Sequence, residues 1–437
     1  MLLPDGFGRR AAVYALGHNF HISRTGGREM TLSIRETDKI VPEYSMTGDL
    51  LSHRRCGLQY RLYNRGALPP SKPVQQWFGE FIHGVMEEAY YRWSAGTIPL
   101  EFPWHWHVIQ PIEIDVHTML LAKGLQAPPG LFRRYNEAGD PRLQRRLASY
   151  RAEAALNTWA SHLFPLVQAA EVRLKGSRLI PHIIDASRAW ATRYTVTGVV
   201  DVLSSVALRE ADESNRIVAE LMNDPFIRSE LASGATFDVI VDYKGMRRPV
   251  PGDAAWTEQA WQLRTYAWLR QQQVPDRRVI AGVLLYLNEL IPARADLLEL
   301  VGDSTGNGGR QTDLPASGAD LQDLQMLQEA LAAATRRRDP DLELLEEYEA
   351  ADNQVSETLR IARSFRLVEM NEASIAEALD GFDRTVADIE RCVYQESTTG
   401  DVQDSWPAYF ERRTCVACDF KYQCPTGRAL GEIPAVP

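Results

Sequence analysis

The stretch Phe237-Asp238-Val239-Ile240-Val241-Asp242-Tyr243-Lys244-Gly245 decides how this chain is interpreted. Its apolar and β-branched residues predict a short buried strand that ends in Asp-x-Lys. Residues two apart on a strand point to the same face, so Asp242 and Lys244 are expected to project together. A carboxylate beside an ammonium group can hold a divalent cation and position a water, which points to metal-assisted hydrolysis.

The Asp-x-Lys triplet by itself is a weak signal. With 58 acidic residues and six lysines among 437 residues, chance predicts about one such triplet. A second triplet, Asp419-Phe420-Lys421, does occur, and no apolar run precedes it. The weight given to Asp242 depends on the residues that surround it.

Composition limits the class of protein. A hydrophobic content of 45% supports a globular core, and no apolar run approaches the ~18 residues of a membrane helix. The N-terminus lacks the basic-then-apolar layout of a signal peptide, so we expect a cytoplasmic protein. A net charge of −10 argues against a general nucleic-acid coat, although it leaves room for a local basic groove.

The order of predicted elements indicates an α/β fold. Apolar stripes predict helices near 44–60, 78–93 and 143–163, and the segment 111–142 has no clear period. Strands are expected over 170–175, 194–203, 237–244 and 279–287, with a helix at 256–273 forming a strand–helix–strand crossover. A loop at 302–318 and helices at about 319–338, 341–365 and 372–396 follow.

Three cysteines near the C-terminus, in the pattern Cys415-x2-Cys418-x5-Cys424, are typical of metal ligation in an intracellular chain. A fourth ligand is missing from the pattern, and Cys56, Cys392 or a histidine would have to supply it. Cys392 lies within a regular helical pattern, whereas Cys56 follows a predicted helix end, which suits a ligand better. The spacing alone leaves zinc and an iron–sulfur cluster as alternatives.

A second acidic residue strengthens the case for a metal site at Asp242. Asp201 ends an apolar strand in Thr197-Gly198-Val199-Val200-Asp201, and a buried charge there is costly unless it is paired or bound to metal. His83, on the 78–93 helix, would by itself be interpreted as a core histidine. The pair His105 and His107 shows strand spacing without a third ligand, so we expect it to be structural or exposed.

Taken in order, these motifs resemble the PD-(D/E)XK nuclease superfamily, in its RecB-like branch that includes CRISPR-associated exonucleases and carries a four-cysteine iron–sulfur cluster. The resemblance covers roughly residues 45–425, departs from the family pattern at Thr47 and Gly57, and includes long insertions. The matching motifs are Ser45-x-Thr47 with Cys56 and Tyr60, Gly79-x3-His83, Glu171, Gly198-x2-Asp201, Asp242-x-Lys244, Gln262-x3-Tyr266 and the Cys415, Cys418, Cys424 triad.

The resemblance implies a role for each matched residue. Asp201 and Asp242, with His83 and the backbone carbonyl of Tyr243, would bind Mg²⁺ or Mn²⁺. Lys244 would orient or help to deprotonate the attacking water. The remaining assignments are Glu171 at or beside the metal, Gln262 and Tyr266 holding the DNA strand or Lys244, and Cys56, Cys415, Cys418 and Cys424 binding a structural 4Fe-4S cluster.

The resemblance also implies a restriction-endonuclease-like mixed sheet flanked by helices, with a helical insertion and a C-terminal Fe–S clasp. The expected parts are an arm (1–43), a helical N-terminal part (44–166), the nuclease core (167–300), a loop and helical appendage (301–400) and the cysteine segment (401–437). The expected function is a metal-dependent DNA exonuclease or end-processing nuclease, beside a helicase or another repair or defence protein. The alternatives are a non-cleaving DNA-binding scaffold and an iron–sulfur electron carrier.

Overall fold

The computed structural model describes residues 41–64, 74–127, 147–181, 192–205, 214–232, 237–306, 309–333, 355–410, 415, 418–422, 424 and 426. The arm expected at 1–43 lies outside these residues up to position 40. Most of the helix expected at 341–365 also lies outside them.

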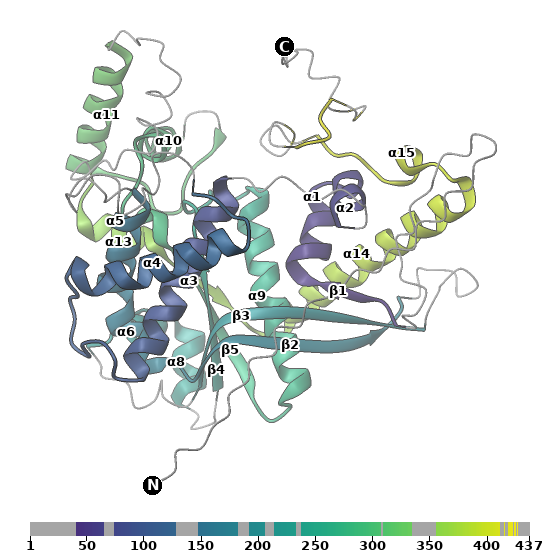
Figure 1. The fold of residues 1–437 in the computed structure, drawn as a ribbon, viewed down its shortest axis with the longest axis horizontal. Coiled ribbons are helices and arrows are strands. Elements are labelled where there is room, and N and C mark those ends of the chain that lie inside the picture. Colours follow the sequence, from purple (N-terminus) through teal and green to yellow (C-terminus); the bar gives the residue numbers. More distant parts are fainter. Residues whose placement is uncertain are drawn as a thin grey trace.

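A six-stranded mixed sheet forms the centre of the molecule (Figure 1). The strand order is β1-β3-β4-β5-β6, and β2 also pairs with β3. The pairs β1–β3 and β4–β5 are parallel, and the others are antiparallel. The strands are β1 Glu43–Ser45, β2 Ala169–Leu179, β3 Arg193–Ser205, β4 Phe237–Lys244, β5 Arg278–Tyr286 and β6 Phe365–Glu369. The prediction of an α/β fold with a mixed sheet is confirmed.

Helices cover both faces of this sheet. The N-terminal helices are η1 Met46–Leu51, α1 Ser52–Arg55, α2 Gly57–Asn64, α3 Val74–Ser94, α4 Trp106–Ala122, α5 Leu147–Ala155, η3 Leu156–Ala160, α6 Ser161–Leu163 and η4 Phe164–Leu166. The later helices are α7 Arg216–Asn223, α8 Pro225–Ala232, α9 Ala254–Gln273, η6 Leu287–Glu289, α10 Arg294–Thr305, α11 Gly318–Ala333, α13 Glu357–Ser364, α14 Glu372–Thr399 and α15 Val402–Ser405.

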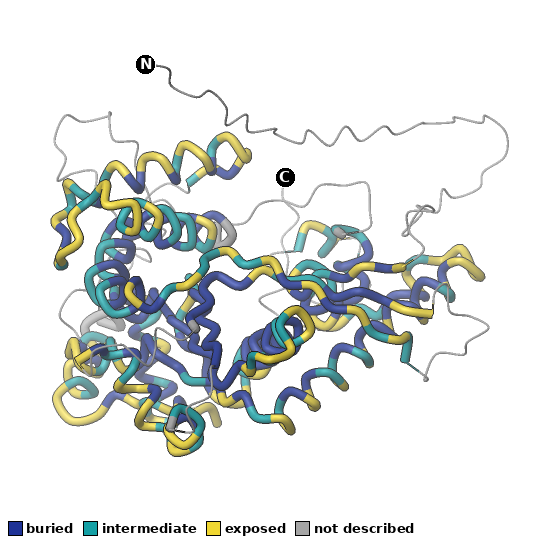
Figure 2. Tube along the Cα trace, turned by 90° about the horizontal axis from the view of Figure 1, so that it is seen from below, coloured by how far each residue is buried: buried dark blue, intermediate teal, exposed yellow. Residues whose placement is uncertain are grey.

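Two apolar clusters, one on each side of the sheet, make the core. One joins α3, α4 and α5 to residues such as Val241 of β4, and the other joins η1, α2, α9 and α14 to residues such as Ile240. The alternation of Ile240 and Val241 between clusters follows from the two-residue period of a strand. Burial on both sides explains why β4 and β5 are almost wholly apolar, and the central strands are dark blue in Figure 2.

The crossover around the Asp-x-Lys strand forms as predicted. β4 has the predicted bounds, α9 follows it, and β5 returns parallel to β4. A right-handed crossover of this kind requires a helix long enough to return along the sheet, and α9 supplies 20 residues. This unit places Asp242 and Lys244 at the end of a strand that α9 covers.

Some local predictions are wrong. His105 precedes α4 and His107 lies in its first turn, so the two are not on a strand, and α4 continues through Pro111 where an irregular segment was expected. The helix expected to reach residue 365 ends at Ser364, and β6 follows as an edge strand of the sheet. The predicted helix near 44–60 forms, but it is interrupted at Cys56, whose backbone is extended.

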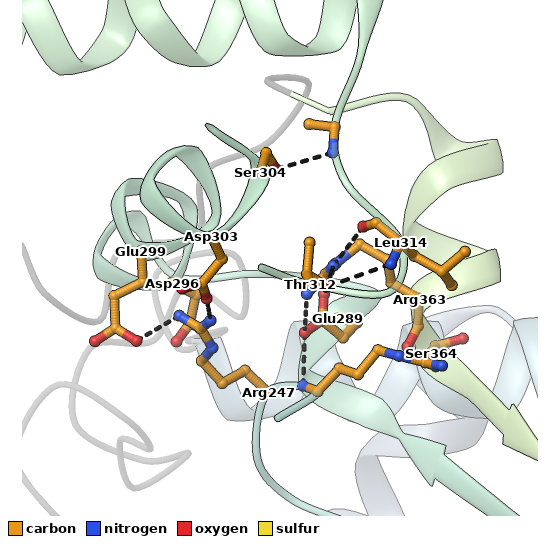
Figure 3. A network of polar contacts seen from close by, with 12 residues as sticks. Arg247, Glu289, Asp296, Glu299, Asp303, Ser304, Thr312, Leu314, Arg363 and Ser364 are labelled. Carbon is orange, nitrogen blue, oxygen red and sulfur yellow. Dashed lines mark hydrogen bonds and ion pairs between the residues drawn. The ribbon is translucent and has the colours of Figure 1, made fainter. Parts of the chain in front are cut away.

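Ion pairs hold the segment that follows β4. Arg247 pairs with Glu299 and Asp303 of α10, and Figure 3 shows these three side chains together. Nearby, Arg363 donates to both oxygens of Glu289 at 2.7 and 3.1 Å, with both side chains buried. Removing one partner of the buried Arg363–Glu289 pair would be costly, so α13 is fixed against η6, while the Arg247 pairs join α10 to the chain beyond the Asp-x-Lys strand.

Candidate active site

His83 lies on α3 and contacts residues of β3 and β4. Its Nδ1 is 3.3 Å from Oδ2 of Asp201, and its ring meets the ring of Tyr243 edge to face with centroids 5.7 Å apart. The sequence motif of Gly79 and His83 thus brings a histidine of one helix onto two strands.

Asp201 lies where β3 separates from β4. The ladder between the two strands ends at Val202–Val241, and the next backbone N–H, that of Tyr243, donates to Asp201 Oδ2 at 2.7 Å. A side-chain carboxylate replaces the missing ladder bond and satisfies a buried donor. Asp201 is accordingly held by both strand and helix.

Asp242, Lys244, Gln262 and Tyr266 form a chain of polar contacts between β4 and α9. Lys244 Nζ pairs with Asp242 Oδ2 and donates to Gln262 Oε1 at 2.9 Å. Gln262 Nε2 in turn donates to the Tyr266 hydroxyl at 2.9 Å. The four-residue spacing of Gln262 and Tyr266 puts them on one face of α9, as expected.

Gly198 explains why the strand can approach Tyr266. A Cβ at this position would lie 2.3 Å from the Tyr266 ring. Only glycine leaves room for the ring between β3 and α9. The glycine of the Gly-x-x-Asp motif therefore sets the position of the tyrosine in the Gln-x3-Tyr motif.

Glu171 lies across from Asp201 and has an unusual backbone. The β2–β3 register pairs Ala170 with Val202 and Val172 with Val200, which leaves Glu171 opposite Asp201. Its φ is +52°, in the left-handed region that non-glycine residues rarely adopt. Strain of this kind persists only where the surrounding structure enforces it, and it is concentrated at functional sites.

One cleft of about 1050 Å³ contains all of these side chains. It lies open between α3, the β2–β3 hairpin and the start of α9. The predicted site residues that line it are His83, Glu171, Asp201, Asp242, Tyr243, Lys244, Gln262 and Tyr266. Residues spread over more than 180 positions of sequence are brought into a single concave site.

The cleft holds an excess of buried acid. Burial opposes ionisation of Asp201 and raises its pKa, but His83 and the Tyr243 N–H outweigh burial and lower that pKa. Burial raises the pKa of Asp242 even though Lys244 acts against it. Burial, then Asp201 and Glu87, raise the pKa of Glu171 to about 7. Burial thus opposes ionisation of Asp242 and Glu171, whereas Asp201 stays easier to ionise than a free aspartic acid.

His83 carries the compensating charge in this arrangement. Burial disfavours its charged form, but Asp201 and Asp242 outweigh burial and raise the pKa of His83 to about 9. His83 and Lys244 thus lie in direct contact with Asp201 and Asp242, respectively. The buried carboxylates of Asp201 and Asp242 require positive charge beside them.

The donor types suit a hard divalent cation, because two carboxylates, a backbone carbonyl and an imidazole are ligands of Mg²⁺ and Mn²⁺. Their arrangement is not that of a formed metal site. Among the described residues, no group of three or more His, Cys, Asp or Glu side chains is placed to hold a metal ion. The His83–Asp201 and Lys244–Asp242 pairs would have to open for these donors to reach one ion.

Glu87 is a site residue that the sequence interpretation missed. It lies four residues after His83 on α3, lines the cleft, and has a raised pKa because of burial and the neighbouring Glu88. The i, i+4 spacing from His83 was the signal that could have identified it. Arg55 and Glu258 also line the cleft and were not predicted. They form an ion pair in which Arg55 Nη2 and Glu258 Oε2 are 3.2 Å apart.

The four cysteines proposed as ligands differ in their surroundings from Cys392. Cys56 is buried between α1 and α2, and Cys424 packs partly buried against the same apolar cluster, while Cys415 and Cys418 are also only partly buried. Cys392 is buried on α14, and burial raises its pKa to about 12, as expected of a structural thiol.

The segment with the three cysteines contacts the helix that follows Cys56. The rings of Tyr63 and Phe420 have centroids 5.0 Å apart, and the Tyr63 hydroxyl accepts the Asp419 N–H at 3.0 Å. A Cβ at Gly57 would lie 2.9 Å from the ring of Pro407, so the chain's departure from the family pattern at this position coincides with a close packing contact. The C-terminal Fe–S clasp stays a prediction.

No family model matches the chain, and neither does any curated protein. The fold and site define an α/β protein with a helix-covered mixed sheet and an acidic cleft at the end of its central strands. Within the described residues, no helix is long and apolar enough to cross a membrane.

Proposed function

We propose that this protein is a metal-dependent DNA nuclease of the PD-(D/E)XK type that hydrolyses phosphodiester bonds in single strands or at DNA ends. The observation that carries the proposal is the convergence of His83, Asp201, Asp242 and Lys244 in one open cleft. These residues come from three separate sequence motifs, and a shared cleft is what a common chemical task requires. Repair, recombination or phage defence in the cytoplasm, with a helicase as partner, is the setting we infer from the family resemblance.

The chain's own residues would divide the work of hydrolysis. Lys244, held between Asp242 and Gln262, would orient the attacking water and offset charge at the phosphorus. Tyr266 would fix Gln262, and Glu171 would adjust the charge of the cleft beside Asp201. Catalysis would rest on positioning and charge stabilisation.

Asp201, Asp242, His83 and the Tyr243 carbonyl would hold Mg²⁺ or Mn²⁺, which supplies a polarised phosphate oxygen and a more acidic bound water. The chemistry of this donor set supports the assignment. An imidazole must be neutral to bind a cation, so metal affinity would fall as pH decreases.

We further propose that Cys56, Cys415, Cys418 and Cys424 bind a structural 4Fe-4S cluster. Support comes from the spacing of the triad and from the contact of its segment with α2, which begins directly after Cys56. Zinc remains the alternative metal, since four thiolates suit either.

A non-cleaving scaffold is the second candidate function. It would be favoured by the loss of a catalytic group, but His83, Asp201, Asp242 and Lys244 are all retained. An electron carrier is disfavoured by the separation of Cys56 and Cys415, which are 359 positions apart, because ferredoxin ligands lie much closer together in sequence.

Cleavage of end-labelled single- and double-stranded DNA with Mg²⁺ or Mn²⁺ tests the proposal. We expect Asp242→Ala and Lys244→Ala to lower the cleavage rate by about 100- to 1000-fold, the usual cost of removing one charge-stabilising group. Lys421→Ala, in the second Asp-x-Lys triplet, is the matched control and should cleave like the wild type. Equal cleavage by all four proteins, or none by the wild type with either metal, would contradict the proposal.

A further inference from the structure

The β2–β3 hairpin carries two exposed cations beside the acidic centre. Arg173 and Lys175 are exposed on β2 and alternate with Leu174 and Gly176, which face α9. A Cβ on Gly176 would lie 2.7 Å from the Trp268 ring, which fixes the side of the strand that is covered. Arg173 and Lys175 consequently face away from α9 and line the cleft that holds the candidate catalytic residues.

The two cations are spaced along a line that starts at the acids. Two residues of a strand rise about 7 Å, so Arg173 lies about 7 Å and Lys175 about 14 Å along β2 from Glu171. On β3 the register sets Val199 opposite Arg173 and Thr197 opposite Lys175, and both also line the cleft. Val199 is 40% exposed, which is unusual for a valine in a central hairpin.

The charges of these side chains are available to a ligand. Lys175 pairs with Glu43 at 2.8 Å, but the two side chains are 61% and 43% exposed, and such pairs contribute little to stability. The Arg173 guanidinium has no ion pair among the described residues, while its backbone carbonyl accepts a hydrogen bond from Gln273. Neither cation is needed to neutralise the acids of the active centre.

We propose that Arg173 and Lys175, with Val199 across from Arg173 on β3, form a track that binds the sugar–phosphate backbone of the strand being cut. The inference rests on the proposed nuclease function and adds the residues that position its substrate. Arginine and lysine would each contact one phosphate, and Val199 would contact the apolar face of a sugar or base. Arg173 and Lys175 are positioning residues, since they lie about 7 and 14 Å along β2 from Glu171 and do not reach the reacting phosphate.

Binding tests the track separately from cleavage. The probe is a fluorescein-labelled single strand of about 20 nucleotides, read by anisotropy with Ca²⁺ in place of Mg²⁺ over a range of salt concentrations. Arg173→Ala/Lys175→Ala should weaken binding about tenfold at moderate salt and reduce the slope of log K against log salt by about 1.4, which is two single-strand phosphate contacts. Arg384→Ala/Arg391→Ala, which removes two exposed charges from α14, is the matched control and should keep the wild-type slope.

Cleavage provides the second measurement. The p-nitrophenyl ester of thymidine 5′-phosphate is too short to reach the track, so the double variant should hydrolyse it at the wild-type rate. On the long strand the same variant should show a raised KM with kcat nearly unchanged, because the lost contacts lie away from the reacting phosphate.

Two outcomes would overturn the track. One is an unchanged affinity and salt slope in the double variant, and the other is an equal loss on the long and the minimal substrate. A wild type that binds the strand with these two residues but cleaves neither substrate would leave the track standing and contradict the nuclease proposal instead.

Discussion

At the scale of single residues, the main feature of the cleft is that two carboxylates are buried side by side at its centre. Asp201 and Asp242 are 8% and 3% exposed, and two buried carboxylates so close together require positive charge nearby. His83 and Lys244 are the basic side chains that contact them. The pairs His83–Asp201 and Lys244–Asp242 therefore hold the centre of the cleft together.

Gln262 is expected to act by holding Lys244. Its Oε1 accepts from Lys244 and its Nε2 donates to Tyr266, so Gln262→Leu would release the ammonium while keeping the volume. We expect a fall of about 10- to 100-fold in the single-turnover cleavage rate, with DNA affinity within about twofold of the wild type, since one charge-assisted hydrogen bond is lost.

Tyr266→Phe is the matched comparison, because it removes only the outer hydrogen bond of the same chain. Its rate should fall less than that of Gln262→Leu. Cleavage in which Tyr266→Phe is the more damaged variant would show that the tyrosine contacts the substrate directly.

Much of the site could be predicted residue by residue, and some of it could not. The order of short motifs predicted His83, Asp201, Asp242, Lys244 and Gln262, because each lies at a fixed offset on a strong strand or helix. The left-handed backbone of Glu171 was not predictable, since glutamate has no preference for it. Side-chain pairing across the cleft depends on the tertiary structure.

At the scale of elements, the accuracy of the predictions follows the strength of the local pattern. β4, α9 and β5 were predicted almost to the residue, because an apolar strand and a long amphipathic helix leave few alternatives. β6 was missed because its five residues, Phe-Arg-Leu-Val-Glu, directly follow a helix. It becomes a strand only through pairing with β5, which lies some 80 residues earlier in the sequence.

Helix α1 contains a pH-sensitive contact. His53 is buried against the rings of Tyr60 and Trp406, with centroids 5.7 and 6.0 Å away, and burial lowers its pKa to about 4 despite the attraction of Asp388. The unfolded chain, with a histidine pKa near 6.5, binds the proton first as pH falls. Stability should decrease between pH 6.5 and 4 by up to about 3 kcal/mol from this residue.

Urea unfolding at several pH values measures this effect, and His53→Phe is the control. Phenylalanine keeps an aromatic ring in the same place and cannot be protonated, so its stability should decline less steeply over that pH range. Parallel curves for the two proteins would mean that His53 is not buried in its neutral form.

At the scale of the whole molecule, the N-terminal helices are tied to the C-terminal quarter of the chain. Arg61 of α2 makes a buried two-bond ion pair with Glu396 of α14 at 2.7 and 2.8 Å, and Trp406 donates to the same glutamate at 2.7 Å. Leu58 donates its N–H to the Pro407 carbonyl at 3.0 Å. These contacts bring the segment after α15 toward Cys56 without any metal.

The proposed cluster would strengthen an attachment that already exists, and its loss should have a local effect. We expect anaerobically purified wild type to contain iron and to absorb broadly near 400 nm, and Cys418→Ser to lose both. In the variant, limited proteolysis should cleave the chain beyond Tyr409 faster, while the sheet and its cleft stay folded, since neither apolar cluster of the sheet includes Cys415 or Cys418 and Cys424 only packs at the edge of one.

Cys392→Ser separates a ligand from a structural thiol, because it also removes one cysteine but from the packed face of α14. It should keep its iron, its absorption and the wild-type proteolysis rate in the C-terminal segment, with a modest loss of thermal stability from the buried hydroxyl. Loss of iron in Cys392→Ser with retention in Cys56→Ser would assign the fourth ligand to α14. Protein without iron but with one bound zinc would keep the attachment and change only the metal, because four thiolates hold either.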